Sequence, residues 1–309
     1  MARADAPGPA YDGAVPRPSR SVPRPSDRAT ARAGRRPPWT IFAIAGLVVA
    51  IVAVLLVGGG GDGATPVAAD RSPTPVPTTT ATAPTPVRAP LRELRIEPMR
   101  PGTAKVVQRG PTKGRKIAFT FDDGYCKACV ADLVGTLRRT GMPATLFPNG
   151  QYASSWEPQA ARIRRMIREG QVTVGSHTWS HPDMRTLSDA ALAADVDRNE
   201  RWIQKTFHVS GRPWLRPPFG AYHEGTLRVL GSRGYTRVIM WSGTVADSSP
   251  RTTDYLVDAV RHWAKPGVIM LLHANYPNTA KAIPRMLEAL RNRDLTPVTI
   301  DDLLGGSQG

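Results

Sequence analysis

Residues 116–124 read KIAFTFDDG. The first six form a short run of mostly apolar and aromatic residues, and two aspartates and a glycine follow directly. A short apolar run bounded by a turn signal is typical of a buried strand. We therefore predict a strand over residues 116–121 with two carboxylates, Asp122 and Asp123, at its carboxyl end.

The sequence on both sides of this stretch alternates short apolar runs with amphipathic segments. Further strands are predicted at 144–148, 172–176, 214–216, 237–241, 268–272 and 296–300. Helices are predicted at 131–140, 158–169, 188–207, 224–231, 253–263 and 280–293, with Ser188 as the N-cap of the third. Alternating strands and helices imply parallel βαβ units, and hence an α/β fold built as a barrel or an open doubly wound sheet.

Polar side chains cluster where the predicted strands end. They are Asp122 and Asp123, His177 and His181, Arg216 in the run 216–220, Asp247, and His273. In barrels of parallel strands the active site forms at the carboxyl ends of the strands. We therefore expect these residues, from five separate segments, to converge on one face.

Two of these segments together offer the ligands of a catalytic metal. His177 and His181 are four residues apart, so their rings meet on one side if the segment makes a helical turn. One aspartate completes a set of three protein ligands, and the other is left for a different role. An HxxxH pair alone is often solvated, and a strand-terminal aspartate often caps a helix. The occurrence of all these residues in order, at matching strand ends, favours a shared site.

Four motifs resemble those of the polysaccharide deacetylases, carbohydrate esterase family 4. They are Thr120-Phe121-Asp122-Asp123-Gly124, His177-Thr178-Trp179-Ser180-His181, Arg216-Pro217-Pro218-Phe219-Gly220 and Leu271-Leu272-His273. The resemblance extends over residues 115–304. It implies a distorted (β/α) barrel that removes acetyl groups from N-acetylated sugars, or O-acetyl groups in some members.

The resemblance also implies a metal site. Carried over residue by residue, Asp123, His177 and His181 bind a divalent metal, usually zinc, with cobalt or another divalent ion as the alternative.

The same resemblance assigns the remaining roles. Asp122 is the general base toward a metal-activated water molecule, and Arg216 holds that aspartate. The backbone N–H of Phe219 stabilises the tetrahedral oxyanion, Leu271 shapes the acetyl pocket, and His273 protonates the departing amine. Such a positioned acid or base contributes about 10²–10⁴-fold to a rate.

A fifth family motif is altered in this sequence. The family pattern is Asp-x-x-Asp-Trp, whose second aspartate supports the catalytic histidine. Here Asp247 matches that aspartate, but Thr244 replaces the first aspartate and Ser248 replaces the tryptophan. Phe219 also stands where the family has tyrosine. We expect the catalytic support to persist and the sugar-facing wall to differ.

The two cysteines of the chain, Cys126 and Cys129, follow the proposed metal loop directly. Outside the cytoplasm a local disulfide is expected. Two free thiols, extra metal ligands or a redox pair are the alternatives, and nothing else in the sequence supports the redox pair.

The N-terminal third has a different composition. Residues 1–38 are rich in Arg and Pro and predict a disordered tail, and residues 39–58 form an apolar run predicted to cross a membrane. Residues 59–98, rich in Gly, Pro and Thr, predict a linker, and residues 99–309 the catalytic domain. Arginines precede the apolar run, so the positive-inside rule places the catalytic domain outside the cytoplasm, on a single-pass anchor. The alternative is a cleaved signal peptide and secretion.

The chain carries a net charge of +16. In residues 99–309 the excess, 29 Lys and Arg against 18 Asp and Glu, is scattered without a block that alternates with aromatic residues. We therefore expect no nucleic-acid partner, and attraction to an anionic cell-wall polymer or lipid surface explains the charge.

An enzyme tethered beside the cell wall implies an N-acetylated glycan substrate, most plausibly peptidoglycan. The alternatives are an O-acetyl esterase, a chitin or xylan deacetylase of the same family, and a catalytically inactive glycan-binding module. The presence of all three metal ligands, the base and the acid argues against the inactive module.

Overall fold

The computed structural model describes residues 91–305, which contain nine strands and eight α-helices. The strands are β1 (Lys105–Val107), β2 (Lys116–Asp123), β3 (Ala144–Pro148), β4 (Val172–Val174), β5 (Trp214–Leu215), β6 (Arg237–Ile239), β7 (Gly243–Thr244), β8 (Ile269–His273) and β9 (Thr296–Val298). The helices are α1 (Lys127–Thr140), α2 (Ala153–Trp156), α3 (Ala160–Arg168), α4 (Asp189–Phe207), α5 (Glu224–Ser232), α6 (Thr253–Trp263), α7 (Pro277–Arg291) and α8 (Ile300–Leu304). Short 3₁₀ turns lie at Gly150–Tyr152, Glu157–Gln159, Met184–Thr186 and Pro218–Gly220.

The strand predicted from KIAFTFDDG is the centre of the fold. β2 pairs in parallel with β3, β8 and β9, and all but its two end residues are buried. Its side chains alternate between two environments: Phe119 and Phe121 pack in the core that includes the helices, and Ala118 packs in a second core with Trp214 and Ile269. Both faces are covered, which is why the strand is a continuous apolar run.

The strands form two parallel sheets. One has the order β4-β3-β2-β8-β7 with β9 beside β2, and the other has the order β1-β6-β5. A parallel bridge between Ser176 and Leu215 joins them on one side, and the chain passes directly from β6 to β7 on the other. The predicted α/β fold with parallel strands is confirmed, and its strands follow one another around an interrupted, distorted ring.

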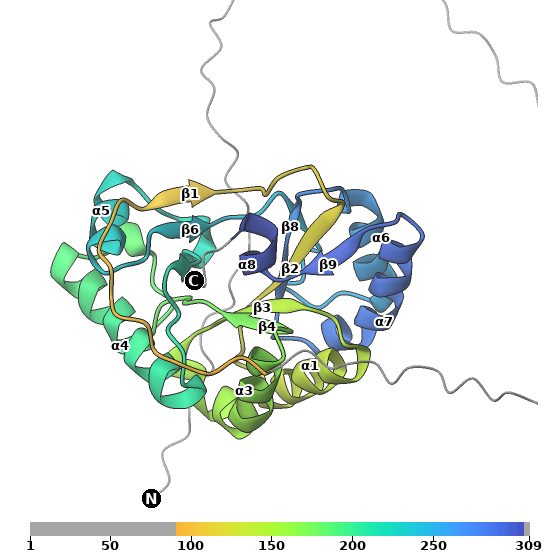
Figure 1. Cartoon of the computed structure of the whole chain (residues 1–309), viewed down its shortest axis with the longest axis horizontal. Coiled ribbons are helices and arrows are strands. Elements are labelled where there is room, and N and C mark those ends of the chain that lie inside the picture. The colour runs from red at the N-terminus through yellow and green to blue at the C-terminus, as the bar shows by residue number, and fades with distance from the viewer. Residues whose placement is uncertain (1–90, 306–309) are drawn as a thin grey trace, which may run out of the picture. The chain divides into compact units, whose positions relative to one another are not determined.

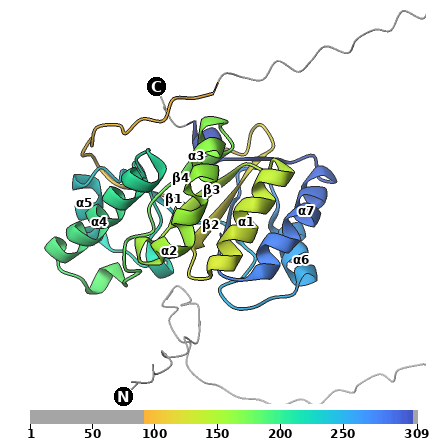
Figure 2. The same ribbon diagram turned by 90° about the horizontal axis from the view of Figure 1, so that it is seen from below.

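Helices α1, α3, α4, α5, α6 and α7 lie around the outside of the strands, and α8 lies over one end of them (Figure 1). Seen from below, α3, α1 and α7 lie side by side (Figure 2). In α3 the apolar Ile163 and Met166 face the core, whereas Arg162 and Arg165 are exposed. This 3.6-residue periodicity is what predicted the helix.

One predicted helix end is confirmed and others differ. Ser188 is the N-cap of α4, and its Oγ accepts a hydrogen bond from the N–H of Ala191 at 3.2 Å. Helix α1 begins at Lys127, four residues before the prediction, because the sulfur of Cys126 accepts from the N–H of Cys129 and caps the helix there. The two- and three-residue strands β7 and β1 were not predicted, because so short a run has no readable periodicity.

The predicted tail, transmembrane helix and most of the linker fall on residues 1–90, which lie outside the described part of the chain. Within residues 91–305 no helix is both long and apolar enough to span a membrane. Among the linker residues that the structure describes, Arg92 contacts the domain, since its N–H donates to the carbonyl of Arg168 at 2.8 Å.

Candidate active site

The predicted site residues lie at the carboxyl ends of adjacent strands. Asp122 and Asp123 end β2, and His273 ends β8, directly beside it. His177 follows β4, Arg216 follows β5, and Asp247 follows β7. The parallel strand arrangement therefore brings together residues that are up to about 150 positions apart, as expected for this end of such a fold.

Asp123, His177 and His181 form a cluster in which one ligand atom from each lies within 4.8 Å of the others. The Oδ1 atom of Asp123 is 3.4 Å from Nε2 of His177 and 3.3 Å from Nε2 of His181. Zinc ligands at about 2.0–2.1 Å in a tetrahedron are separated by about 3.4 Å. This Oδ1 is buried and has no hydrogen-bond partner. The spacing, the donor types and the unpartnered oxygen all fit a divalent metal such as zinc.

The surrounding backbone fixes the orientation of the two histidines. Nδ1 of His177 lies 2.7 Å from the carbonyl of Arg216, so it carries the proton and leaves Nε2 available as a ligand. The amide of Asn149 donates to the carbonyls of His177 and Thr178. His181 has a positive φ of 55°, which turns its ring back toward His177, and the two ring centroids are 5.0 Å apart.

Asp122 and Asp123 diverge, although they are adjacent in the chain. Oδ1 of Asp122 accepts a hydrogen bond from Arg216 at 2.9 Å, and its other oxygen is 3.8 Å from Nε2 of His177. Arg216 is fully buried, and its guanidinium also donates to Oγ1 of Thr120 at 2.6 Å and to the carbonyl of Ile239 at 3.1 Å. A buried, fully hydrogen-bonded arginine holds this carboxylate in one position beside the metal ligands.

Asp247 holds His273 through both of its oxygens. Oδ1 lies 2.8 Å from Nδ1 of His273, and Oδ2 accepts from the backbone N–H of His273 at 3.1 Å and from the hydroxyl of Thr279 at 2.7 Å. Nδ1 therefore carries a proton directed at the carboxylate, and Nε2 is the ring atom left for chemistry.

Burial and nearby charges shift the pKa values of His181 and His273 in opposite directions. Burial disfavours the charged form of His181 and lowers its pKa to about 4, with the neighbouring His177 adding to the shift. Burial alone would also lower the pKa of His273, but the hydrogen bond and charge of Asp247 raise it to about 9. One histidine is therefore neutral, as a metal ligand must be, and another keeps its proton above neutral pH.

Phe219 borders this cluster, and Leu271 lies two residues before His273 in β8. Phe219 lies in the turn Pro218–Gly220 with a positive φ of 59°, and its ring centroid is 4.6 Å from that of His181. Leu271 is buried in β8, where it pairs with Thr120 of β2.

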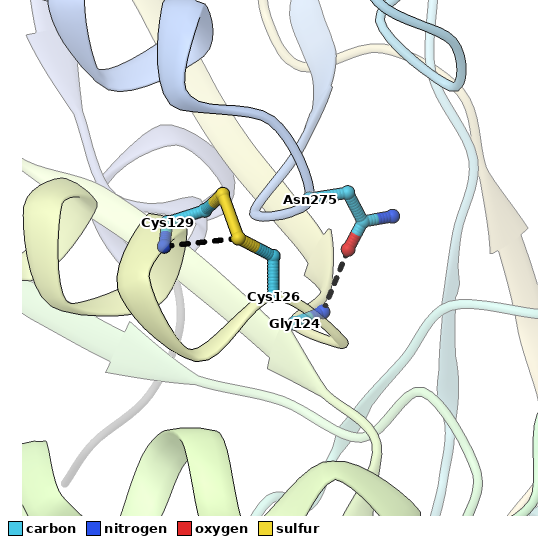
Figure 3. Close-up of a disulfide and its surroundings, with 4 residues drawn as sticks. All are labelled: Gly124, Cys126, Cys129 and Asn275. Atoms are coloured by element: carbon cyan, nitrogen blue, oxygen red, sulfur yellow. Dashed lines mark hydrogen bonds between the residues drawn. A yellow bond between two sulfur atoms is a disulfide. The ribbon is translucent and has the colours of Figure 1, made fainter.

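The cysteines form a disulfide at the start of α1 (Figure 3), with an S–S distance of 2.06 Å. It lies immediately after the loop that carries the aspartates. The three other histidines do not join the site: His208 ends α4, His223 caps α5 by accepting from the N–H of Thr226, and His262 packs against Trp263.

Comparison with known protein families matches residues 109–238 to the polysaccharide deacetylase family. A chitooligosaccharide deacetylase of Bradyrhizobium sp. (strain ANU 289) is 30% identical over 193 residues, which cover 58% of this chain and 86% of the relative. The chain belongs to the polysaccharide deacetylase family. The peptidoglycan-N-acetylmuramic acid deacetylase PdaA of Bacillus subtilis is 29% identical over 198 residues, covering 63% of this chain and 73% of the relative.

Solved structures share the fold. A CE4 family pseudoenzyme from Bacillus anthracis superposes with a TM-score of 0.58 at 21% identity, covering 66% of this chain and 70% of that chain. Since a pseudoenzyme shares this fold, the fold alone does not establish activity, which depends on the residues of the site.

Sequence reasoning missed three residues that support the deacetylase-family site. Asn275 donates to Oδ2 of Asp123 at 2.8 Å, Asn149 holds the histidine loop, and Thr279 donates to Asp247. Both asparagines lie just after a strand. Asn275 is two residues beyond the end of β8, and Asn149 is one residue beyond the end of β3. That position, at the active-site end of the sheet, is the signal that could have found them.

Proposed function

We propose that this polysaccharide deacetylase hydrolyses the N-acetyl groups of a cell-wall glycan, with peptidoglycan as the substrate. The observation that carries the proposal is the buried Oδ1 of Asp123, which has no hydrogen-bond partner and lies 3.3–3.4 Å from two imidazole Nε2 atoms. A buried carboxylate oxygen left without a partner costs free energy unless a ligand occupies the site. Relatives named for acting on peptidoglycan and on chitooligosaccharides support the substrate class.

Asp123, His177 and His181 would hold the metal, for which we propose zinc. Two nitrogens and one oxygen are a ligand set that zinc takes in catalytic sites. When bound, such an ion polarises the carbonyl of the acetyl group and lowers the pKa of water toward neutrality.

Asp122 and His273 divide the proton transfers between them. Asp122, held by Arg216, takes a proton from the water molecule whose oxygen bonds to the acetyl carbon. His273, held in its protonated form by Asp247, gives a proton to the sugar nitrogen as the C–N bond breaks. Acetate and a free amine are the products. The amine is a poor leaving group, which is why an acid is needed opposite the base.

Two further residues shape the reaction in this proposal. The backbone N–H of Phe219 would donate to the oxyanion, a contribution of about 3–4 kcal/mol for a preorganised donor. The buried Leu271 would form the wall of the acetyl pocket.

We further propose that the catalytic domain acts outside the cytoplasm, anchored by residues 39–58. The apolar run, the arginines before it and the disulfide at Cys126–Cys129 support this location. Membrane fractionation of cells that express the full-length chain tests the anchor. Recovery of a shortened chain from the medium would instead show cleavage and secretion.

The direct test of the activity is acetate release by the full-length protein from purified peptidoglycan, before and after metal chelation. We expect chelation to abolish release and added zinc to restore it. A protein that binds zinc and glycan but releases no acetate is a binding module, and the proposed activity would be wrong.

A further inference from the structure

Three tyrosines from three strand-end loops meet beside the metal-ligand cluster. Tyr125 follows β2, Tyr152 follows β3, and Tyr276 follows β8. The ring centroid of Tyr125 is 6.2 Å from that of Tyr152 and 6.0 Å from that of Tyr276, both in edge-on geometry. The other two tyrosines are partly buried, whereas 47% of the surface of Tyr125 stays exposed. We call these three residues the tyrosine cluster.

The two chain neighbours of Tyr125, Gly124 and Cys126, are both held in place (Figure 3). Before it, the N–H of Gly124 donates to Oδ1 of Asn275 at 3.1 Å. After it, the disulfide ties Cys126 to Cys129 in the first turn of α1. An exposed aromatic residue by itself indicates nothing, since many occur on any surface. An exposed ring held from both sides is preorganised, so binding a ligand there costs little conformational entropy.

The position of the tyrosine cluster beside the proposed catalytic residues indicates which part of the substrate it contacts. Tyr125 is two residues from Asp123, and Tyr276 is three residues from His273, which ends β8. The acetyl group to be cleaved has to reach Asp123 and His273. The ring of Tyr125 lies next to Asp123 and His273 but outside the group that handles the acetyl group. It is therefore placed to contact the sugar that neighbours the reacting sugar.

We propose that Tyr125, supported by Tyr152 and Tyr276, is the platform on which the neighbouring sugar ring of the glycan stacks. This inference rests on the proposed glycan substrate and adds a specific subsite to it. One face of a pyranose ring carries C–H groups, which are attracted to the electron-rich face of an aromatic ring. The platform makes the protein select oligomers over isolated N-acetylated sugars.

The test compares the full-length wild type with Tyr125→Ala, Tyr125→Phe and Trp263→Ala. Trp263 is also an exposed aromatic residue (40%), but it ends α6 just before the segment that enters β8, at the opposite end of the strands. Acetate release is measured on a peptidoglycan tetrasaccharide and on a single N-acetylated sugar, which has no neighbouring ring. For Tyr125→Ala we expect the ratio of the two kcat/KM values, tetrasaccharide over single sugar, to fall about tenfold through the KM of the tetrasaccharide, a typical loss when a tyrosine that binding buries is truncated. Tyr125→Phe keeps the ring and should stay within about twofold of wild type.

A binding measurement separates this inference from the proposed activity. Calorimetric titration with the tetrasaccharide gives Kd for the same variants, each carried in the Asp122→Asn background so that the ligand is not hydrolysed during the titration. Weaker binding by Tyr125→Ala, with Trp263→Ala unchanged, supports the platform even if the wild type proves inactive. Equal Kd values for wild type and Tyr125→Ala, an equal loss in Trp263→Ala, or no binding by the wild type would overturn the platform. Acetate release with an unchanged ratio in Tyr125→Ala would overturn the platform and leave the activity standing.

Discussion

The amide of Asn275 donates a hydrogen bond to Oδ2 of Asp123 at 2.8 Å, and this leaves Oδ1 of Asp123 directed at the two imidazoles. The carbonyl oxygen of the same amide accepts from the N–H of Gly124. Asn275 therefore fixes both the ligand carboxylate and the loop that carries it. It lies two residues after the proposed acid, so in the proposed mechanism the loop after β8 would support both the metal ligand and the proton transfer.

Removing this amide should weaken metal binding. In Asn275→Ala, Asp123 loses the partner that orients its carboxylate, and we expect metal affinity to fall by about 10–100-fold. Competition with a chromogenic zinc chelator measures the affinity. Asn278→Ala is the matched control, because its amide donates to the carbonyl of Arg251 on the exposed surface. Equal affinities for the two variants would contradict a role for Asn275 in positioning the ligand.

The two adjacent aspartates should give opposite results. Asp123→Ala removes a ligand, so bound zinc and acetate release should be lost together. Asp122→Asn keeps a side chain of the same shape, so it should retain zinc while turnover falls by about 10²–10⁴-fold. Zinc content by elemental analysis, alongside acetate release, distinguishes the two. Full turnover in Asp122→Asn would remove Asp122 as the base.

Asp247 should control the alkaline side of the pH profile. Burial lowers the pKa of His273, whereas Asp247, with smaller effects of Asp123 and Asp122, raises it to about 9. The protonated form is the acid, so activity is present below this pKa and is lost as the pH rises through it. In Asp247→Asn the burial remains without the carboxylate, so the alkaline limb of kcat/KM should move to lower pH by about one to three units. An unmoved limb would show that His273 is not the acid.

The disulfide should contribute modestly to stability. It joins residues only three positions apart, and closing so short a loop accounts for about 2 kcal/mol of unfolding free energy. We expect Cys126→Ser/Cys129→Ser to lose about that much in urea unfolding and still to release acetate. Loss of all activity in a folded, zinc-bound double variant would revive a redox role for the pair.

The central part of the fold could be predicted because its strands are buried on both faces. In β2 and β8 every interior residue is buried, so each strand is an apolar run that ends in a polar residue. The order of those polar residues then located the active-site end. All seven predicted strands have counterparts in the structure, and the differences are confined to their ends and to short elements such as β1 and β7.

The positions of Asn275 and Asn149 after strand ends could mark them as candidates, but the roles of the residues that support the site could not be predicted in the same way. Asn275, Thr279 and Asn149 act through single hydrogen bonds to partners far away in the sequence or on another element. An amide or hydroxyl has no periodicity, and its role exists only once the chain is folded. The tyrosine cluster escaped prediction for the same reason, since its members are separated by up to about 150 residues.

Arg216 contacts two parts of the site through different atoms: its carbonyl lies 2.7 Å from Nδ1 of His177, and its guanidinium donates to Asp122. The proposed metal ligand and the proposed base are thus both hydrogen-bonded to one buried residue. A displacement of this short segment after β5 would carry both of them with it. In the proposed mechanism the distance between the metal and the base would therefore change little when this segment moves, and displacing Arg216 should impair metal binding and proton transfer together.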